Sequence, residues 1–222
     1  MTSSVQGSSL TSGNKTSGNK KNWFIAGAAI LVLLMTIAID TTVVTIGSDQ
    51  DARQQAFSPD DFGRDEFPRI QKFVLENAIE ATKLASELAE NKKSATEKFA
   101  TATGVFPIFP VRFVGVAGEG KSGIFNIVVE GMPDGAKVRV QTGPAINGTE
   151  LRDVPDDIEF GAFKNQIEYQ NVGAGINKAM SAEILSALDR ESLTGKTVTV
   201  VGAFKMINPK NWLVTPVEFT VQ

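Results

Sequence analysis

The chain has 222 residues, enough for one ordinary domain with a tail or an anchor, and its formal net charge is −3. It contains no cysteine and no histidine, which excludes Ser-His-Asp and Cys-His catalysis and zinc sites built on those ligands. All acidic residues lie in residues 40–222, so this part of the chain has a net negative charge. Such a charge argues against binding of DNA or RNA, which requires clustered positive charge.

The amino-terminal residues predict a tail followed by a membrane segment. Residues 1–22 are rich in Ser, Gly and Asn, carry the repeat TSGNK–TSGNK and lack apolar periodicity, which predicts a disordered cytoplasmic tail. The next stretch, WFIAGAAILVLLMTIAI, has no charge, and an apolar patch follows it. We therefore predict a transmembrane signal-anchor over residues 23–46.

The charges around this segment predict its orientation. Lys20 and Lys21 precede it, and Asp40 and Asp49 follow its apolar core, which fits the positive-inside rule. We expect a single-pass protein of the cytoplasmic (inner) membrane, with its amino terminus inside and its main domain periplasmic. A retained anchor is favoured because no A-x-A site follows the apolar core, and a cleaved signal peptide is the alternative.

Residues 57–104 predict a small helical subdomain. Ser58 is suited to cap a helix whose first residue is Pro59. Pro68 is expected to interrupt this helix. Apolar residues recur at helical spacing from Ile70 to Leu88, and a second short helix is expected around residues 95–102.

Residues 105–222 predict an OB-like β-barrel domain. Three antiparallel strands are expected after Phe106, with turns at AGEGKSG and GMPDGA. A polar loop over residues 144–157, a helix around residues 172–188 and two final strands follow, with an edge or bulge at Pro216. The predicted fold class is α+β, in which an antiparallel OB-like barrel with an inserted helix follows the anchor and the helical subdomain.

The stretch GVAGEGKS, Gly115–Ser122, satisfies the phosphate-loop pattern G-x-x-x-x-G-K-[ST]. A phosphate loop needs a helix after it, because the amino terminus of that helix helps to bind the phosphates. The residues that follow are GIFNIVV, which predict a strand. We therefore interpret the stretch as a glycine-rich hairpin turn and expect no nucleotide to bind.

One segment of the sequence carries a recognisable set of residues, which are Gly143, Pro144, Gly148, Thr149, Leu151, Arg152, Asp153, Phe160, Phe163, Asn165, Gln166, Ile167, Glu168, Tyr169 and Asn177. With these residues the chain resembles a bacterial family of predicted periplasmic lipoproteins of unknown function, often encoded beside sugar ABC transporters. The resemblance covers about residues 57–222. The resemblance implies a helical subdomain joined to an OB-like barrel outside the cytoplasmic membrane. Members usually carry a lipid-bearing cysteine, which this sequence lacks, so a transmembrane anchor would replace the lipid.

The candidate ligand-binding residues lie in the same segment, at Arg152, Asp153, Asn165, Gln166, Glu168 and Tyr169. Amides, carboxylates and an aromatic ring suit sugar hydroxyls and the apolar faces of sugar rings. The structural alternative is that Asn165 and Gln166 satisfy backbone groups where a helix starts, with Tyr169 in the core. Phe160 and Phe163 are expected in the core, and Trp212 either closes the barrel or forms an exposed contact.

Arg152 and Asp153 adjoin an acidic loop that contains Asp156, Asp157 and Glu159. Its spacing lacks the alternating ligands of a calcium loop, so we expect solvated charges and no metal or cofactor. Arg152 is expected to fix the loop through a neighbouring carboxylate.

We expect a non-enzymatic, membrane-tethered protein that assists uptake of simple sugars by contacting an ABC transporter permease or its substrate-binding protein. The alternative is a module that binds a saccharide or glycan through the barrel. A hydrolase using two of Asp153, Asp156, Asp157 and Glu159, and a purely structural role in the envelope, are the remaining hypotheses.

Overall fold

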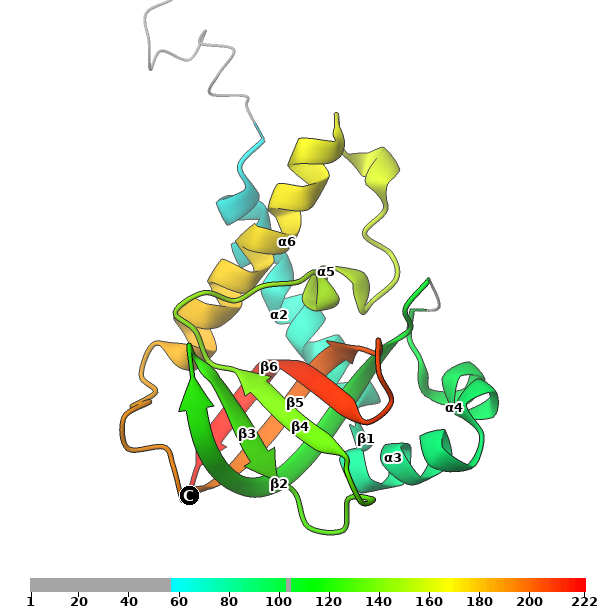
Figure 1. Ribbon diagram of the computed structural model, residues 1–222. Helices are drawn as coiled ribbons and strands as arrows, with labels where there is room; N and C mark the ends of the chain where they lie inside the picture. Colours follow the sequence, from blue (N-terminus) through cyan, green and yellow to red (C-terminus); the bar gives the residue numbers. More distant parts are fainter. Residues whose placement is uncertain (1–56, 103–104) are drawn as a thin grey trace, which may run out of the picture. The chain divides into compact units, whose positions relative to one another are not determined.

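The computed structural model describes residues 57–102 and 105–222, and residues 57–222 form one compact unit. Figure 1 shows a β-barrel with helices α2 and α6 over one end and helices α3 and α4 beside it. The predicted tail and signal-anchor over residues 1–46 lie outside the described residues. Within the described residues, no helix is long and apolar enough to cross a membrane. The division into two parts at residue 104 stays a prediction.

Helix α2 begins where the sequence predicts, whereas a break at residues 78–80 divides the expected helical stretch Ile70–Leu88, and the next helix begins at Lys92 rather than near residue 95. Helix α2 spans Pro59–Asn77, and the Ser58 side chain caps it by accepting a hydrogen bond from the Asp61 N–H at 3.2 Å. Helix α3 (Ala81–Glu90) and helix α4 (Lys92–Phe99) follow a two-residue strand, β1 (Ile79–Glu80).

The predicted interruption at Pro68 is wrong. Helix α2 continues through Pro68 to Asn77. Proline removes one backbone hydrogen bond and costs about 3 kcal/mol in a helix interior. The helix persists because Phe67, Ile70 and Val74 on its inner face are fully buried in the core.

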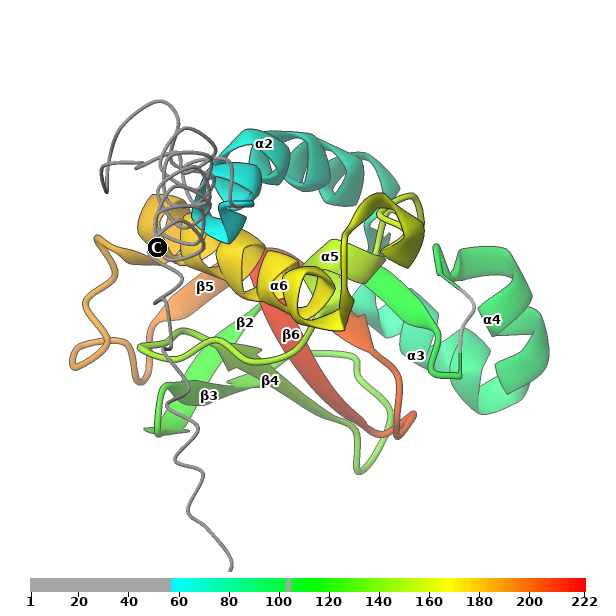
Figure 2. The ribbon, with the colours of Figure 1, turned by 90° about the horizontal axis from the view of Figure 1, so that it is seen from above.

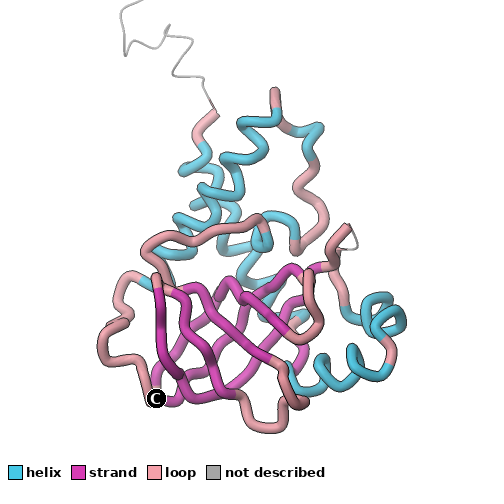
Figure 3. Tube along the Cα trace, in the orientation of Figure 1, coloured by secondary structure: helices cyan, strands magenta, loops and turns pink. Residues whose placement is uncertain are grey.

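The barrel contains strands β2 (Ile108–Lys121), β3 (Ile124–Val128), β4 (Lys137–Gln141), β5 (Thr197–Lys205) and β6 (Asn211–Val221). The sheet order is β1-β2-β3-β4-β6-β5, and pairing of β2 with β5 closes the ring (Figure 3). The expectation of an antiparallel barrel is wrong at two pairs, because β1–β2 and β4–β6 are parallel. The connection through α6 leads to β5, which pairs with β2, and the hairpin to β6 then reverses the chain again, so β6 runs beside β4 in the same direction.

Pro216 lies at a bulge, as predicted. The register of β5 and β6 shifts between Val201, which pairs with Glu218, and Gly202, which pairs with Pro216. Gly202 is required here, because a Cβ at this position would clash with the Thr215 carbonyl oxygen.

The connection between β4 and β5 carries short helix α5 (Glu150–Asp153), a 3₁₀ turn (Phe160–Ala162) and helix α6 (Gln166–Met180), which continues as a π-helical turn (Ser181–Leu185). Viewed from above, α6 runs beside α2 across the barrel (Figure 2). The crossing is close because Gly63 and Gly175 face each other, and a Cβ on either would clash with the opposite backbone.

Two hydrophobic clusters share strand β5. The first fills the barrel, where Trp212 stacks on Phe204 at 4.5 Å and Phe204 stacks on Phe109 at 5.6 Å. Trp212 is buried, so barrel closure is the interpretation that holds. The second cluster lies under α2 and α6, where Val201 and Ala203 of β5 meet the helices. The sequence VTVVGAF is therefore apolar on both faces because both faces of β5 are covered.

Candidate functional site

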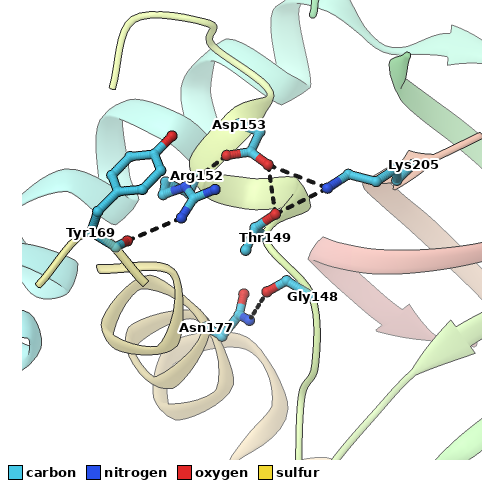
Figure 4. A network of polar contacts seen from close by, with 7 residues as sticks. All are labelled: Gly148, Thr149, Arg152, Asp153, Tyr169, Asn177 and Lys205. Carbon is cyan, nitrogen blue, oxygen red and sulfur yellow. Dashed lines mark hydrogen bonds and ion pairs between the residues drawn. The ribbon is translucent and has the colours of Figure 1, made fainter. Parts of the chain in front are cut away.

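Helix α5 holds a polar network at the end of strand β5 (Figure 4). The Asp153 carboxylate accepts hydrogen bonds from Arg152 Nε at 2.6 Å and from the Thr149 hydroxyl at 2.5 Å. Lys205, the last residue of β5, donates to the Thr149 hydroxyl at 3.1 Å and lies 3.4 Å from Asp153. One carboxylate therefore organises two cations that come from different parts of the fold.

Arg152 also binds helix α6 through Tyr169. Its Nη1 donates to the Tyr169 carbonyl oxygen at 3.0 Å, and its guanidinium carbon lies 3.8 Å from the centre of the Tyr169 ring. The side chain is only 9% exposed. A guanidinium combines bidentate hydrogen bonding with stacking on a ring, which lysine does not. The predicted role of Arg152 in fixing a neighbouring carboxylate is thus present.

The other candidate residues form the start of α6. Asn165 is the N-cap, and its side-chain oxygen accepts hydrogen bonds from the Ile167 and Glu168 N–H groups, both at 2.9 Å. The Glu168 carboxylate accepts the Lys164 N–H at 3.0 Å. Gln166 is exposed in the first helical turn. This geometry is that of helix capping, so the structural alternative holds for Asn165, and Glu168 rather than Gln166 provides the second acceptor.

A pocket of about 430 Å³ opens beside the network of Arg152, Asp153 and Lys205. The candidate residues Arg152, Asp153 and Tyr169 line it, whereas Asn165, Gln166 and Glu168 do not. The full lining is Ala102, Val105, Phe106, Ile108, Arg152, Asp153, Asp156, Ile158, Glu159, Phe160, Tyr169 and Lys205. The residues therefore combine hydrogen-bond donors, carboxylates and aromatic rings around one cavity.

Two phenylalanine rings are exposed at this pocket. Phe106 is 45% exposed and Phe160 is 49% exposed, so the expectation that Phe160 belongs to the core is wrong. Phe160 packs edge-on against Tyr169 at 5.6 Å, because it belongs to the 3₁₀ turn that bends over the start of α6. Phe163 packs partly buried against the cluster under the helices, where it contacts Phe57, Phe62 and Tyr169.

The three carboxylates of the acidic loop have two roles, because one forms an ion pair with α2 and two line the pocket. Asp157 forms a bidentate pair with Arg69 of α2, at 2.7 and 3.1 Å, which raises the pKa of Arg69. Asp156 and Glu159 instead line the pocket. Over residues 57–102 and 105–222, no group of three or more carboxylates is placed to hold a metal ion.

Two pocket residues were missed in the sequence. Lys205 follows a hydrophobic strand and Phe106 precedes one, and neither belongs to a motif. Only the closure of β2 on β5 brings the two strand ends together, with Ile108 opposite Lys205. The one sequence signal was that Lys205 ends the apolar run of β5, whereas Phe106 lies in an apolar stretch and carries no signal of its own.

Glu150, in the same short helix as Arg152 and Asp153, has a buried carboxylate oxygen. Its Oε2 atom has no hydrogen-bond partner among the described residues, and burial raises the pKa of this carboxyl above its usual range. Gly148 at the adjacent turn has a φ of 102°, a backbone conformation that favours glycine. Asn177 of α6 holds the same turn by donating to the Gly148 carbonyl oxygen at 3.0 Å.

The phosphate-loop pattern lies in a β-hairpin. Gly115–Lys121 belong to strand β2, and only Ser122 and Gly123 form the turn, with φ angles of 52° and 74°. The predicted turn at AGEGKSG is therefore shorter than expected, because Ala117–Lys121 pair with β3 around a bulge. Strand β3 follows directly, so the segment has no helix amino terminus at which a phosphate could bind.

Comparison with known proteins agrees with this fold. A solved structure of an OB-fold protein from Thermotoga maritima MSB8 aligns with a TM-score of 0.58 and 20% sequence identity, over 75% of this chain and 99% of that one. No curated protein matches the chain. Residues 28–220 match the family described as predicted periplasmic lipoprotein (DUF2291). The chain therefore belongs to this family of predicted periplasmic lipoproteins, and its own barrel is similar in fold to an OB-fold protein.

Proposed function

We propose that the protein is a non-enzymatic, membrane-tethered extracytoplasmic protein that binds a small saccharide in the pocket between α5, α6 and the end of β5. The observation that carries this proposal is the composition of the cavity wall. Donors come from Arg152 and Lys205, acceptors come from Asp156 and Glu159, and the rings of Phe106 and Phe160 are exposed. Saccharides need polar groups that orient their hydroxyls and flat apolar surfaces for their ring faces.

The size of the cavity agrees with a small ligand. Its volume of about 430 Å³ falls in the range of small-molecule sites, roughly 300–1,000 Å³. The donors are also held in place before any ligand arrives, because Asp153 and Tyr169 fix the Arg152 side chain. Preorganised groups lose less conformational entropy on binding, which favours recognition of weakly bound polar ligands.

The absence of catalysis is part of this proposal. A glycosidase uses two carboxyl groups that flank the scissile bond. Asp157 is paired with Arg69, and Asp153 is held by Arg152, Thr149 and Lys205. The remaining carboxylates of the lining, Asp156 and Glu159, both come from the segment between α5 and the 3₁₀ turn. The sequence also supplies no histidine or cysteine as an alternative base or nucleophile.

The membrane tether is proposed from the sequence. Family members are described as lipoproteins, and this sequence has no cysteine to carry a lipid. The uncharged residues 23–39 have the composition of a membrane segment, and the lysines before them favour an amino terminus inside. We propose that residues 23–46 hold the barrel at the outer face of the cytoplasmic membrane in place of a lipid.

Isothermal titration of the full chain with glucose tests the binding proposal. A detergent without a sugar headgroup is required, because such headgroups would compete for the pocket. Phe160→Ala should weaken binding roughly five-fold, since an aromatic contact contributes about 1 kcal/mol. Ile167→Ala is the matched control, because Ile167 is an exposed apolar residue of the same region that does not line the pocket. Equal affinities for both variants would contradict the proposed site.

A second proposed role is accessory to an ABC uptake system for simple sugars, through contact with its permease or substrate-binding protein. The observation in its favour is an apolar surface on the outside of the barrel, which we call the valine surface. Val116 of β2 pairs with Val128 of β3, Val114 lies on the same face, and all three are exposed. Exposed apolar patches commonly mark protein contacts.

Site-specific crosslinking in intact cells tests this role. A photoreactive residue at Val128 should capture a subunit of a sugar uptake system, whereas the same probe at Ile167, which lies outside the valine surface, should not. Cells shown to express such a transporter, yet yielding no crosslinked subunit from Val128, would rule the contact out.

A further inference from the structure

We infer that the pocket prefers a saccharide carrying a protonated amine to a neutral or an acidic saccharide, an inference that rests on the proposed binding function. It follows from how the charges of the lining residues are distributed. Two cations of the lining, Arg152 and Lys205, share the single carboxylate of Asp153. Asp156 and Glu159 add two further carboxylates, so the lining carries more negative than positive charge.

Asp156 and Glu159 are also free to meet a ligand. Neither forms a salt bridge with any residue in 57–102 or 105–222, and both are exposed. Asp157, between them in the sequence, turns to the outside and pairs with Arg69 of α2. This pair fixes the loop, so the two free carboxylates are presented at the pocket while the third is neutralised.

The aromatic residues of the pocket favour the same ligand. A cation over an aromatic face gains about 0.5–1 kcal/mol at an exposed site, a factor of about two to five in affinity. The Tyr169 ring already carries the Arg152 guanidinium at 3.8 Å. The Phe160 ring stands edge-on to Tyr169 and is half exposed, which leaves a face for a ligand.

Arg152 supplies the independent anchor for the hydroxyl groups. Its side chain is nine-tenths buried and lines the cavity, and it uses Nε and Nη1 for Asp153 and the Tyr169 carbonyl oxygen. Its Nη2 forms no hydrogen bond with the described residues, so this donor remains for a ligand oxygen. The ligand is therefore oriented with hydroxyl groups toward Arg152 and Lys205 and with its amine toward Asp156 and Glu159.

Three sugars with the same ring test this orientation. The full chain is titrated with glucosamine, glucose and glucuronate at low salt and at a mildly acidic pH that keeps the amine protonated. Glucosamine should bind about ten-fold more tightly than glucose, because each hydrogen bond to a charged group contributes more than a neutral one. Glucuronate should bind most weakly, and added salt should reduce the advantage of glucosamine.

Substitution of the two carboxylates identifies the source of the preference. The double variant Asp156→Asn and Glu159→Gln should bind glucosamine about ten-fold more weakly and lose its preference for glucosamine over glucose, because the amides keep an acceptor oxygen for a hydroxyl group but carry no negative charge for the amine. Asp134→Asn, in the β3–β4 connection outside the pocket, removes one exposed carboxylate and should change neither affinity.

The outcomes separate this inference from the proposed function. Equal binding of glucose and glucosamine, or a preference that survives the double substitution, would overturn the inference and leave saccharide binding intact. Failure of all three sugars to bind would overturn both.

Discussion

Arg152 links three elements of the fold at one side chain. It neutralises Asp153 in its own helix, binds the backbone and ring of Tyr169 in α6, and through Asp153 it is connected to Lys205 of β5. Because the guanidinium is buried, each of these contacts is stronger than its solvent-exposed equivalent. The candidate pocket therefore depends on a residue whose role is both structural and ligand-facing.

Glu150 gives the molecule a pH dependence that can be measured. Burial raises the pKa of its carboxyl in the folded protein above the value in the unfolded chain. The folded state therefore binds the proton more tightly, and this group lowers the free energy of unfolding as pH rises from the unfolded pKa through the folded pKa. Below the pKa of the unfolded chain this carboxyl is protonated in both states, so it does not lower the free energy of unfolding.

Glu150→Gln should remove this dependence, because glutamine fills a similar volume without an ionisable proton. Urea unfolding from mildly acidic to neutral pH should show that the variant loses less free energy of unfolding than the wild type across that interval. Parallel pH profiles for the two proteins would mean that Glu150 does not titrate in the way its burial implies.

At the scale of elements, helix α6 is positioned by its first residues and by its crossing with α2. The Asn165 cap fixes where the helix begins, and Tyr169 lies one turn later. Gly175 lets α6 approach α2 so closely that any side chain would meet the Pro59 carbonyl oxygen. Lys178 and Asp60 add an ion pair across the same two helices.

Asn165→Ala should lower the free energy of unfolding by about 1 kcal/mol, because two backbone N–H groups lose their acceptor. Asn165→Asp is the control, since it keeps the acceptor oxygen and suits the positive end of the helix dipole. Chemical denaturation checks both variants. A loss for aspartate as large as that for alanine would show that the cap is not the cause.

Gly175→Ala should destabilise the protein by about 3 kcal/mol or more, because the added carbon meets backbone atoms that cannot move alone. Gly161→Ala, where no atom lies within 4 Å of the added carbon, should leave stability nearly unchanged. The midpoint temperatures of thermal unfolding of the two variants are compared, and similar midpoints would contradict the close packing of α6 on α2.

At the scale of the whole molecule, local signals were readable in the sequence and contacts between distant segments were not. Ser58 and Pro59 predict the start of α2 because a helix cap involves neighbouring residues only. The barrel strands were readable because their apolar residues recur within short segments. The prediction that Pro68 interrupts α2 was wrong because the burial of Phe67, Ile70 and Val74 sustains the helix. That burial depends on contacts with α6 and the barrel, which the local sequence does not show.

The pocket shows the same limit. Arg152, Asp153 and Tyr169 were found because they lie in one segment that resembles the family, whereas Phe106 and Lys205 come from the ends of β2 and β5. Gly175 of α6 is explained by its close contact with α2, a helix far earlier in the chain, so the local sequence does not show why glycine stands there. Closure of the barrel and packing of α6 on α2 are therefore what create the pocket.

The central claim is that this pocket binds a saccharide, and an NMR titration of the isotopically labelled full chain tests it most directly. Addition of glucosamine should shift the backbone amide signals of the pocket, foremost those of Phe106, Arg152, Asp156, Glu159, Phe160 and Lys205, with saturation. Absence of any saturable shift, or shifts gathered elsewhere, as at the β2–β3 hairpin, would contradict the claim.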